Sequence, residues 1–297
     1  MRFVTFFQGQ AARLGLVVET AVIDLHLADL ALPEGMRPFL EAGPEAMERA
    51  AAVLDGWAAG RHSPAAVYPL VGLAFLPPIP NPSKVVAVGA NYWDHCRETG
   101  MEPPKSPVLF AKFPTALIGH GQAIEWDPAL SAEVDYEAEL AVVIGRRARS
   151  VPAERALDVI SGYTCANDVT ARDLQRGDGQ WVRGKSLDTF CPLGPCLVTR
   201  DEVPDPRHLA IACRVNGQTV QDSSTAEMIF AIPTLVESIT RAMTLLPGDV
   251  ILTGTPHGTG GFRLPPLYLK DGDVVEVEIE KVGLLRNPCR TEAGREK

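Results

Sequence analysis

The sequence has no Cys-x-x-Cys pair, no long hydrophobic run and no excess of positive charge. Its six cysteines are widely spaced, and only Cys191 and Cys196 lie near each other. This spacing argues against a zinc-binding module or a disulfide-stabilised scaffold. It predicts reduced, mostly buried thiols in a cytoplasmic protein.

No apolar run approaches the roughly 18 residues that a membrane-spanning helix needs. The opening segment, MRFVTFFQGQAARLGLVV, is interrupted by Gln, Gly and Arg, so it predicts two strands joined by a turn and not a signal peptide. The net charge of −9 argues against nucleic acid or an anionic membrane as the main partner. A composition of 46% hydrophobic and 22% charged residues is ordinary for a globular protein with a sizeable core.

Four prolines between residues 77 and 82 divide the chain. Such a run is incompatible with a helix or a central strand and predicts a stiff linker over residues 77–83. It separates a small N-terminal α+β domain, residues 1–76, from a larger domain, residues 84–297. In the larger domain, strand patterns outnumber helical ones and do not alternate with them, which predicts an α+β, strand-rich fold and disfavours a doubly wound parallel sheet.

Gly179, Gly184, Lys185 and Ser186 form the pattern G-x-x-x-x-G-K-S, which is typical of a phosphate-binding P-loop. A P-loop needs a buried strand before it and a helix after it. Here a polar, helix-like segment precedes the pattern, and two prolines follow it. A second glycine-rich segment, GTPHGTGG at residues 254–261, is followed by prolines and not by a helix, so it predicts a turn-rich loop. A nucleotide-binding protein therefore stays only as an unfavoured alternative.

Glu137 and Glu139 stand two residues apart in EVDYEAEL, so a strand would place both side chains on one face. Two carboxylates beside an apolar run are costly unless a positive charge lies between them. Asp168, at the expected end of another strand, offers a third. Oxygen ligands suit Mg²⁺, Mn²⁺ or Ca²⁺ better than Zn²⁺. A solvated strand face, shared with Glu133 and Asp135, is the alternative.

His95 and Glu98 are three residues apart on a short predicted helix that ends at Gly100, with Asn91 as its expected N-cap. A carboxylate beside an imidazole orients it and raises its basicity, as a general base requires. An exposed surface pair would have the same spacing, and spacing alone favours that alternative.

In their order along the chain, several segments resemble the fumarylacetoacetate hydrolase family. They are VGANYWDH, DYEAELAVVIG, NDVTARDLQ, GQWVRGKSLDTFCPLGP, VNGQTVQDSSTAEMIF, LLPGDVILTGTPHGTG and GDVVEVEIEKVGLLRNP. The resemblance runs from about residue 84 to the C-terminus and is weaker before residue 80. It implies a mixed β-roll or sandwich as the catalytic domain, and a homodimer.

The resemblance also implies the roles of individual residues. Glu137, Glu139 and Asp168 correspond to the ligands of Mg²⁺ or Mn²⁺, and His95 and Glu98 to a pair that activates water or moves protons. Lys185 corresponds to the lysine that stabilises an enolate or carbanion. The positions that bind substrate oxygens correspond to Arg172, Gln175 and Thr255. Some relatives have a fourth carboxylate ligand seven residues before the histidine, where this chain has Val88.

These roles imply a metal-dependent enzyme acting on a 2-oxo or 2-hydroxy-2-enoic acid, as in aromatic-compound catabolism. Cleavage of a C–C bond in an acylpyruvate-type 1,3-diketo acid is the leading hypothesis. Isomerisation or tautomerisation of a hydroxymuconate-type or hydroxyheptadienedioate-type acid, or decarboxylation of oxaloacetate, are alternatives at the same site. A non-catalytic dimeric scaffold is disfavoured, because it would have no use for His95, Glu98 and Lys185. The walls around the substrate's tail are expected from the N-terminal unit and from residues 99–107 and 176–183.

Overall fold

One large mixed sheet runs through the protein in the computed structural model, which describes residues 1–291. Its main path, in spatial order, is β4 (Val67–Pro69), β3 (Ala21–Asp24), β2 (Ala11–Val18), β1 (Arg2–Gln8), β14 (Cys191–Thr199), β12 (Ile160–Asn167), β11 (Ala138–Ile144), β17 (Val250–Leu252), β6 (Val85–Gly89) and β7 (Val108–Lys112). Two short strands join it at the side: β5 (Phe75–Leu76) pairs with β1, and β8 (Leu117–Ile118) pairs with β14.

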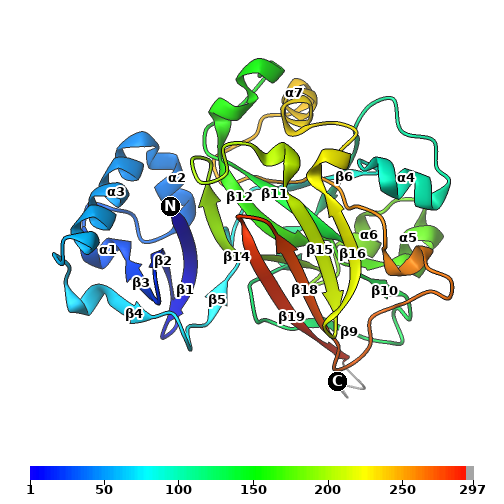
Figure 1. Cartoon of the computed structure of the whole chain (residues 1–297), viewed down its shortest axis with the longest axis horizontal. Coiled ribbons are helices and arrows are strands. Elements are labelled where there is room, and N and C mark those ends of the chain that lie inside the picture. Colours follow the sequence, from blue (N-terminus) through cyan, green and yellow to red (C-terminus); the bar gives the residue numbers. More distant parts are fainter. Residues whose placement is uncertain (292–297) are drawn as a thin grey trace.

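A second sheet covers one face of the large sheet (Figure 1). Its order is β16 (Gln218–Ser224), β15 (Ala210–Val215), β18 (Val274–Ile279), β19 (Gly283–Thr291) and β9 (Ile124–Trp126). Strand β18 alternates between buried and exposed side chains, as its sequence predicts. Its buried residues share one hydrophobic core with Leu140 and Val142 of β11. The arrangement is the strand-rich α+β sandwich that the sequence predicts.

Strand β11 is buried along its whole length because both faces of the sheet are covered there. Leu140 and Val142 enter the core between the sheets, whereas Ala141 and Val143 pack into separate clusters on the opposite face. This explains why the sequence pattern changes from alternating to continuously apolar after Glu139.

The N-terminal unit forms a lobe at one side of the molecule (Figure 1). Strands β1 to β3 pack against α1 (Leu25–Ala28), α2 (Met36–Ala42) and α3 (Pro44–Ala58) around a second core, which also includes Val143 of β11 and Leu197 of β14. Pairing of β1 with β14 makes the lobe's strands continuous with the large sheet. In the proline-rich segment the Pro78 carbonyl accepts a hydrogen bond from Thr5 Oγ1 at 2.8 Å. The domain boundary at residues 77–83 stays a prediction.

The N-terminal lobe also contains the 3₁₀ turn η1 (Pro64–Ala66). The other helical segments belong to the rest of the chain: α4 (Trp93–Thr99), α5 (Arg172–Asp178), α6 (Val182–Lys185), α7 (Ile232–Ala242) and the 3₁₀ turns η2 (Pro114–Ala116), η3 (Ala153–Val159), η4 (Pro206–His208), η5 (Thr225–Glu227) and η6 (Gly260–Phe262). Two further short strands, β10 (Val134–Asp135) and β13 (Thr170–Ala171), pair with each other. Among the described residues, no helix combines the length and apolar character needed to cross a membrane.

The G-x-x-x-x-G-K-S pattern lies where helix α5 turns into helix α6. Helix α5 precedes Gly179, and strand β14 follows after Lys185 and Ser186, so the strand–loop–helix order of a P-loop is missing here. A side chain at Gly184 would meet the backbone of Gln175 at 2.8 Å, because the two helices pack closely. The glycine therefore serves packing, and the local fold gives no phosphate cradle.

Candidate functional site

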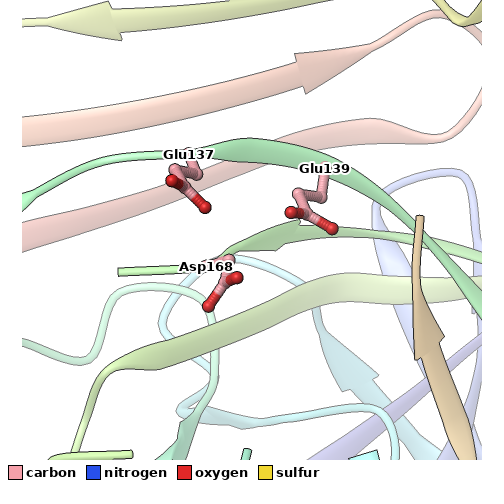
Figure 2. A group of neighbouring side chains, drawn as sticks. All are labelled: Glu137, Glu139 and Asp168. Carbon is pink, nitrogen blue, oxygen red and sulfur yellow. The ribbon is translucent and has the colours of Figure 1, made fainter. Parts of the chain in front are cut away.

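Three carboxylates converge where β11 and β12 are paired. Glu139 lies in β11, Glu137 just before it, and Asp168 directly after β12. The antiparallel register puts Ala138 opposite Asn167, so Glu137 and Asp168 become neighbours, and the Asp168 amide donates to the Glu137 carbonyl at 2.9 Å. One oxygen of each carboxylate lies within 4.8 Å of the others. Figure 2 shows the three side chains grouped together, with those of Glu137 and Glu139 side by side and extending toward Asp168.

Burial excludes a solvated strand face. Glu137 is 5% exposed, Glu139 1% and Asp168 0%. The expectation that both glutamates lie on one regular strand is wrong for Glu137, which sits in the irregular link between β10 and β11. The Asn167 side chain accepts a hydrogen bond from the Glu137 amide at 2.9 Å and stabilises this link. The two-residue spacing still predicts that Glu137 and Glu139 lie on the same face of the sheet, because Glu137 directly precedes the first residue of β11.

Two buried lysines contact this cluster. Lys185 Nζ donates to Glu137 Oε2 at 2.6 Å and to Asp168 Oδ2 at 2.7 Å. Lys112 Nζ lies 2.5 Å from Asp168 Oδ1, with its side chain fully buried. Sequence reasoning missed Lys112. Its signal was a single lysine in the otherwise apolar strand VLFAK, which ought to indicate a buried partner of opposite charge.

The electrostatic environment separates the two glutamates. Burial alone would raise the pKa of Glu137, but the positive charges of Lys185 and Arg172 outweigh it and lower the pKa to about 2. Burial raises the pKa of Glu139 well above its usual value, and the charges of Asp168 and Glu137 raise it further. Among residues 1–291, the site has four buried carboxylates when Asp135 is counted with these three, and three buried cations, Lys112, Arg172 and Lys185.

The donor set fits a hard dication. All three residues offer oxygen, their oxygens are close enough to share one ion, and Glu139 carries an uncompensated negative environment. Glu139 Oε2 accepts a hydrogen bond from the Gly254 amide at 2.8 Å, which fixes the carboxylate's orientation. Val88, at the position of a fourth carboxylate in some relatives, is a buried wall of the same cavity. Glu137, Glu139 and Asp168 could therefore hold one divalent cation with three protein carboxylates.

His95 and Glu98 lie on α4, one turn apart, as predicted. His95 is only 6% exposed, so the alternative of an exposed surface pair is wrong for the histidine, whereas Glu98 lies at the surface. Its Nδ1 lies 3.5 Å from Glu98 Oε2, which is an ion-pair distance without hydrogen-bond geometry; catalytic hydrogen bonds are often this long before substrate binds. Burial acts to raise the pKa of Glu98, but the contact with His95 and the hydrogen bond from the Gly258 amide lower it below its usual value.

The N-terminus of α4 differs from expectation. Tyr92 is the N-cap residue, and the side chain of Asn91 does not cap the helix. Instead, Asn91 Nδ2 donates to the Thr253 carbonyl at 2.7 Å, and its Oδ1 accepts from the Phe230 amide at 2.8 Å. Asn91 thus connects the start of α4 to the end of β17, next to Gly254, whose amide donates to Glu139.

One cavity of about 350 Å³ collects the predicted site residues. Its lining includes His95, Glu137, Glu139, Asp168, Arg172, Gln175, Lys185 and Thr255. Glu98 lies behind His95 and does not line the cavity. A larger groove of about 660 Å³ lies beside Met47 and Arg200, but it gathers no comparable set of buried titratable groups, so chemistry and not size identifies the candidate site.

The three residues expected to bind substrate oxygens have different surroundings. Arg172 donates to Asp135, Glu137 and Gln175, all within 3.0 Å. Thr255 Oγ1 accepts a hydrogen bond from Gln221 Nε2 at 2.9 Å. Geometry brings all three to the cavity, and their contact with substrate stays a prediction.

The outer walls of the cavity match the expectation in part. Met101 comes from the stretch 99–107, and Arg176, Gly179 and Trp181 come from the stretch 176–183. Within residues 1–291, the N-terminal unit contributes no residue to this lining, so that part of the expectation is wrong. Trp181 lies directly on Gly89, where any side chain would meet the indole at 2.5 Å.

Residues 84–290 match the model of the C-terminal domain of fumarylacetoacetate hydrolase. The chain is also 45% identical over 294 residues to the mitochondrial oxaloacetate tautomerase of Xenopus laevis, covering 97% of this chain and 90% of that protein.

Two solved structures extend the comparison. Fumarylacetoacetate hydrolase from the psychrophilic Exiguobacterium antarcticum is 36% identical, with a TM-score of 0.84 and coverage of 98% of this chain and 100% of that one. The 5-carboxymethyl-2-hydroxymuconate delta-isomerase from Mycobacterium smegmatis is 36% identical, with a TM-score of 0.77 and coverage of 99% and 100%.

Proposed function

Because the chain belongs to the fumarylacetoacetate hydrolase family, we propose that it is a divalent-metal-dependent tautomerase or isomerase of a small 2-oxo dicarboxylic acid, with oxaloacetate as the first substrate to test. The observation that carries the proposal is the convergence, in one small cavity, of a three-carboxylate cluster, the buried Lys185 ammonium and the buried His95 ring. Similarity to an oxaloacetate tautomerase over nearly the whole chain supports this choice of reaction.

In this proposal the chain's own residues hold the substrate and move its proton. Arg172, Gln175 and Thr255 bind the carboxylate oxygens. Lys185 donates a hydrogen bond to the oxygen that carries negative charge in the enolate. When bound, Mg²⁺ or Mn²⁺ would supply Lewis-acid polarisation of the 2-oxo group.

His95 transfers the proton. Ketonisation of an enol removes the proton from its hydroxyl oxygen and adds one at the adjacent carbon, so the reaction needs no other reactant. A buried imidazole 3.5 Å from a carboxylate can deliver and recover a proton, and Glu98 keeps the ring oriented. The low pKa of Glu98 favours its charged form, which stabilises the imidazolium.

The experiment follows the decay of enol-oxaloacetate in the presence of Mg²⁺, with buffer containing Mg²⁺ alone as the blank. We expect faster ketonisation with the wild-type protein, and loss of the acceleration with EDTA. An unchanged decay rate at micromolar protein would exclude oxaloacetate tautomerisation. The variant Lys185→Met serves as the matched control, because it keeps the carboxylate cluster.

Hydrolysis of an acylpyruvate is the second candidate, and the specific observation in its favour is the Glu98 carboxylate behind His95. Such a pair can also take a proton from water. Acetylpyruvate would then yield acetate and pyruvate, measured by NMR. Oxaloacetate decarboxylation is tested in the same samples through pyruvate formation.

The homodimer and the cytoplasmic location stay predictions. Light scattering of the purified protein tests the homodimer, for which a mass of twice 32.0 kDa is expected.

A further inference from the structure

Asp135 is a fully buried carboxylate that does not line the cavity. Its two oxygens accept hydrogen bonds from the amides of Gly260, Gly261 and Tyr136 at 2.7, 2.9 and 2.8 Å, and from Arg172 Nε at 2.8 Å. These four donors satisfy both oxygens of the carboxylate. Asp135 therefore joins two separate parts of the site: the arginine on α5 and the glycine-rich loop.

On the side of the arginine, Asp135 fixes the guanidinium in one orientation. Arg172 also donates through Nη2 to Glu137 Oε1 and through Nη1 to Gln175 Oε1. Among residues 1–291, these contacts use three of the guanidinium's five N–H groups, which leaves two for a ligand in the cavity that Arg172 lines.

On the side of the loop, the same segment supports the proton-transfer pair. The Gly258 amide donates to both oxygens of Glu98, at 3.0 and 3.1 Å. The ring of Phe262, at the end of η6, packs edge-on against His95 with 5.5 Å between ring centroids. The Arg172 guanidinium lies 5.6 Å from the centre of the same Phe262 ring.

The glycines of this loop are explained by the contact with Asp135. A side chain at Gly260 would lie 1.9 Å from the Leu267 carbonyl and 2.7 Å from Asp135 Oδ1. At Gly261 it would lie 3.2 Å from Asp135 Oδ2. The glycine-rich pattern thus allows the backbone amides to approach a buried carboxylate.

We propose that Asp135 is a positioning residue, which holds Arg172 and the loop of residues 258–262 in one rigid frame so that substrate oxygens and the His95–Glu98 pair are aligned. The inference rests on the proposed function only in taking Arg172 as a residue that binds substrate. Asp135 itself contacts neither substrate nor metal.

The test uses oxalate as a non-reacting 2-oxo acid analogue, with Mg²⁺ present, and the variant Asp135→Asn. An amide group cannot accept from Arg172 and from both glycine amides at once, so the arginine loses its fixed orientation. We expect the Kd of oxalate to rise about tenfold. The Kd of Mn²⁺, measured by electron paramagnetic resonance, is expected to change less than about threefold, because the three carboxylate ligands remain.

A double-mutant cycle with Arg172→Met separates positioning from general stabilisation. If Asp135 acts through the arginine, Asp135→Asn changes the Kd of oxalate in the Arg172→Met background by less than about twofold. An equal loss in both backgrounds would overturn the proposal. So would an unchanged Kd of oxalate in Asp135→Asn alone.

Asp249→Asn is the matched control. Asp249 is also fully buried and also accepts from four donors, Ser83 Oγ, Lys84 N, Lys84 Nζ and Leu246 N, but it lies at the opposite end of β17. It is expected to lower thermal stability and leave the Kd of oxalate unchanged. A Kd that rises equally in the control would attribute the effect to destabilisation and overturn the proposal.

If Asp135→Asn fails to fold, the variant Gly261→Ala tests the positioning role of Asp135 in its place. Its methyl group would press on Asp135 Oδ2 and on Arg172 Cγ, at 3.2 and 3.4 Å, without removing a hydrogen bond. We expect a rise of about threefold or more in the Kd of oxalate at near-native stability, and an unchanged Kd would contradict the proposal. Because oxalate binding needs no turnover, these results stand even if the wild-type protein fails to ketonise enol-oxaloacetate, which would refute only the proposed function.

Discussion

Strands β6 and β17 run parallel, and both of their ends bury carboxylates, but the two ends differ in charge balance. At the start of β17, Asp249 pairs with Lys84 at 2.5 Å and accepts from two further backbone amides. One negative charge meets one positive charge there, and every strong acceptor site has a donor. This is a structural ion pair, and among residues 1–291 it leaves no unbalanced charge and no free acceptor of Asp249 with which a ligand could pair.

At the carboxyl end of the same strands, the carboxylates outnumber the cations. Among residues 1–291, the four buried carboxylates there, Asp135, Glu137, Glu139 and Asp168, lie with three buried cations, Lys112, Arg172 and Lys185. Burial raises the pKa of Glu139 well above its usual value, and the charges of Asp168 and Glu137 raise it further. The two groups of carboxylates therefore have different uses: a balanced one, whose lysine is partly exposed, stabilises the fold, and an unbalanced one can bind a dication. The predictions below test that contrast.

The largest effect is expected from Glu139→Gln. It removes one of three ligands while keeping the shape of the side chain and its hydrogen bond from Gly254. We expect the Kd of Mn²⁺ to rise about a hundredfold and turnover to fall to background. Calorimetric titration with Mn²⁺ and the ketonisation assay measure the two effects. Retained metal affinity would show that this carboxylate is not a ligand.

Lys185→Met is expected to separate chemistry from metal binding. The ammonium contacts Glu137 and Asp168, and its removal leaves their oxygens in place for the dication. We expect kcat to fall about a hundred- to a thousandfold, as when an oxyanion donor is lost. The Kd of Mn²⁺ should stay the same or decrease. A variant with near-normal kcat would assign the stabilising role to another group.

Glu98→Gln is expected to have a smaller effect, because Glu98 acts through His95. A loss of about ten- to a hundredfold in kcat/KM is expected. In the wild-type protein the lowered pKa of Glu98 means that the carboxylate stays charged as pH falls through the ordinary glutamate value of 4.5. If protonation of Glu98 reduces activity, the reduction is therefore expected below pH 4.5. A profile of kcat/KM against pH measures where activity falls.

Asp249→Asn tests the balanced end of the strands and should have the smallest effect on activity. The amide cannot accept from all four donors of the buried carboxylate, and it weakens the contact with the partly exposed Lys84, which is expected to cost about 2 kcal/mol of unfolding free energy. Chemical denaturation measures this cost. Because the site lies at the other end of the strands, kcat and the Kd of Mn²⁺ are expected to stay within about twofold of the wild type.

Much of the site was predictable because its signals are local. Alternation along EVDYEAEL indicates which residues share a face, and the spacing of His95 and Glu98 puts them one helical turn apart. Both predictions survive in the structure, although Glu137 lies just outside the regular strand. Lys112 and Asp135 were missed or misassigned, because a lysine or aspartate in a strand has the same local pattern whether it faces solvent or a buried partner.

The sequence by itself determined the strand-rich composition of the fold, the helix that carries His95 and Glu98, the helical segment before Gly179, and the candidate ligands, since each depends on periodicity and residue type over a few positions. Only the tertiary structure decided which charges meet. Asp168 reaches Glu137 through the register of β11 and β12. Asp135 reaches Arg172 across 37 residues of chain and the Gly260 amide across 125. Contacts between residues so distant in sequence depend on how the two sheets pack, and no short pattern encodes that.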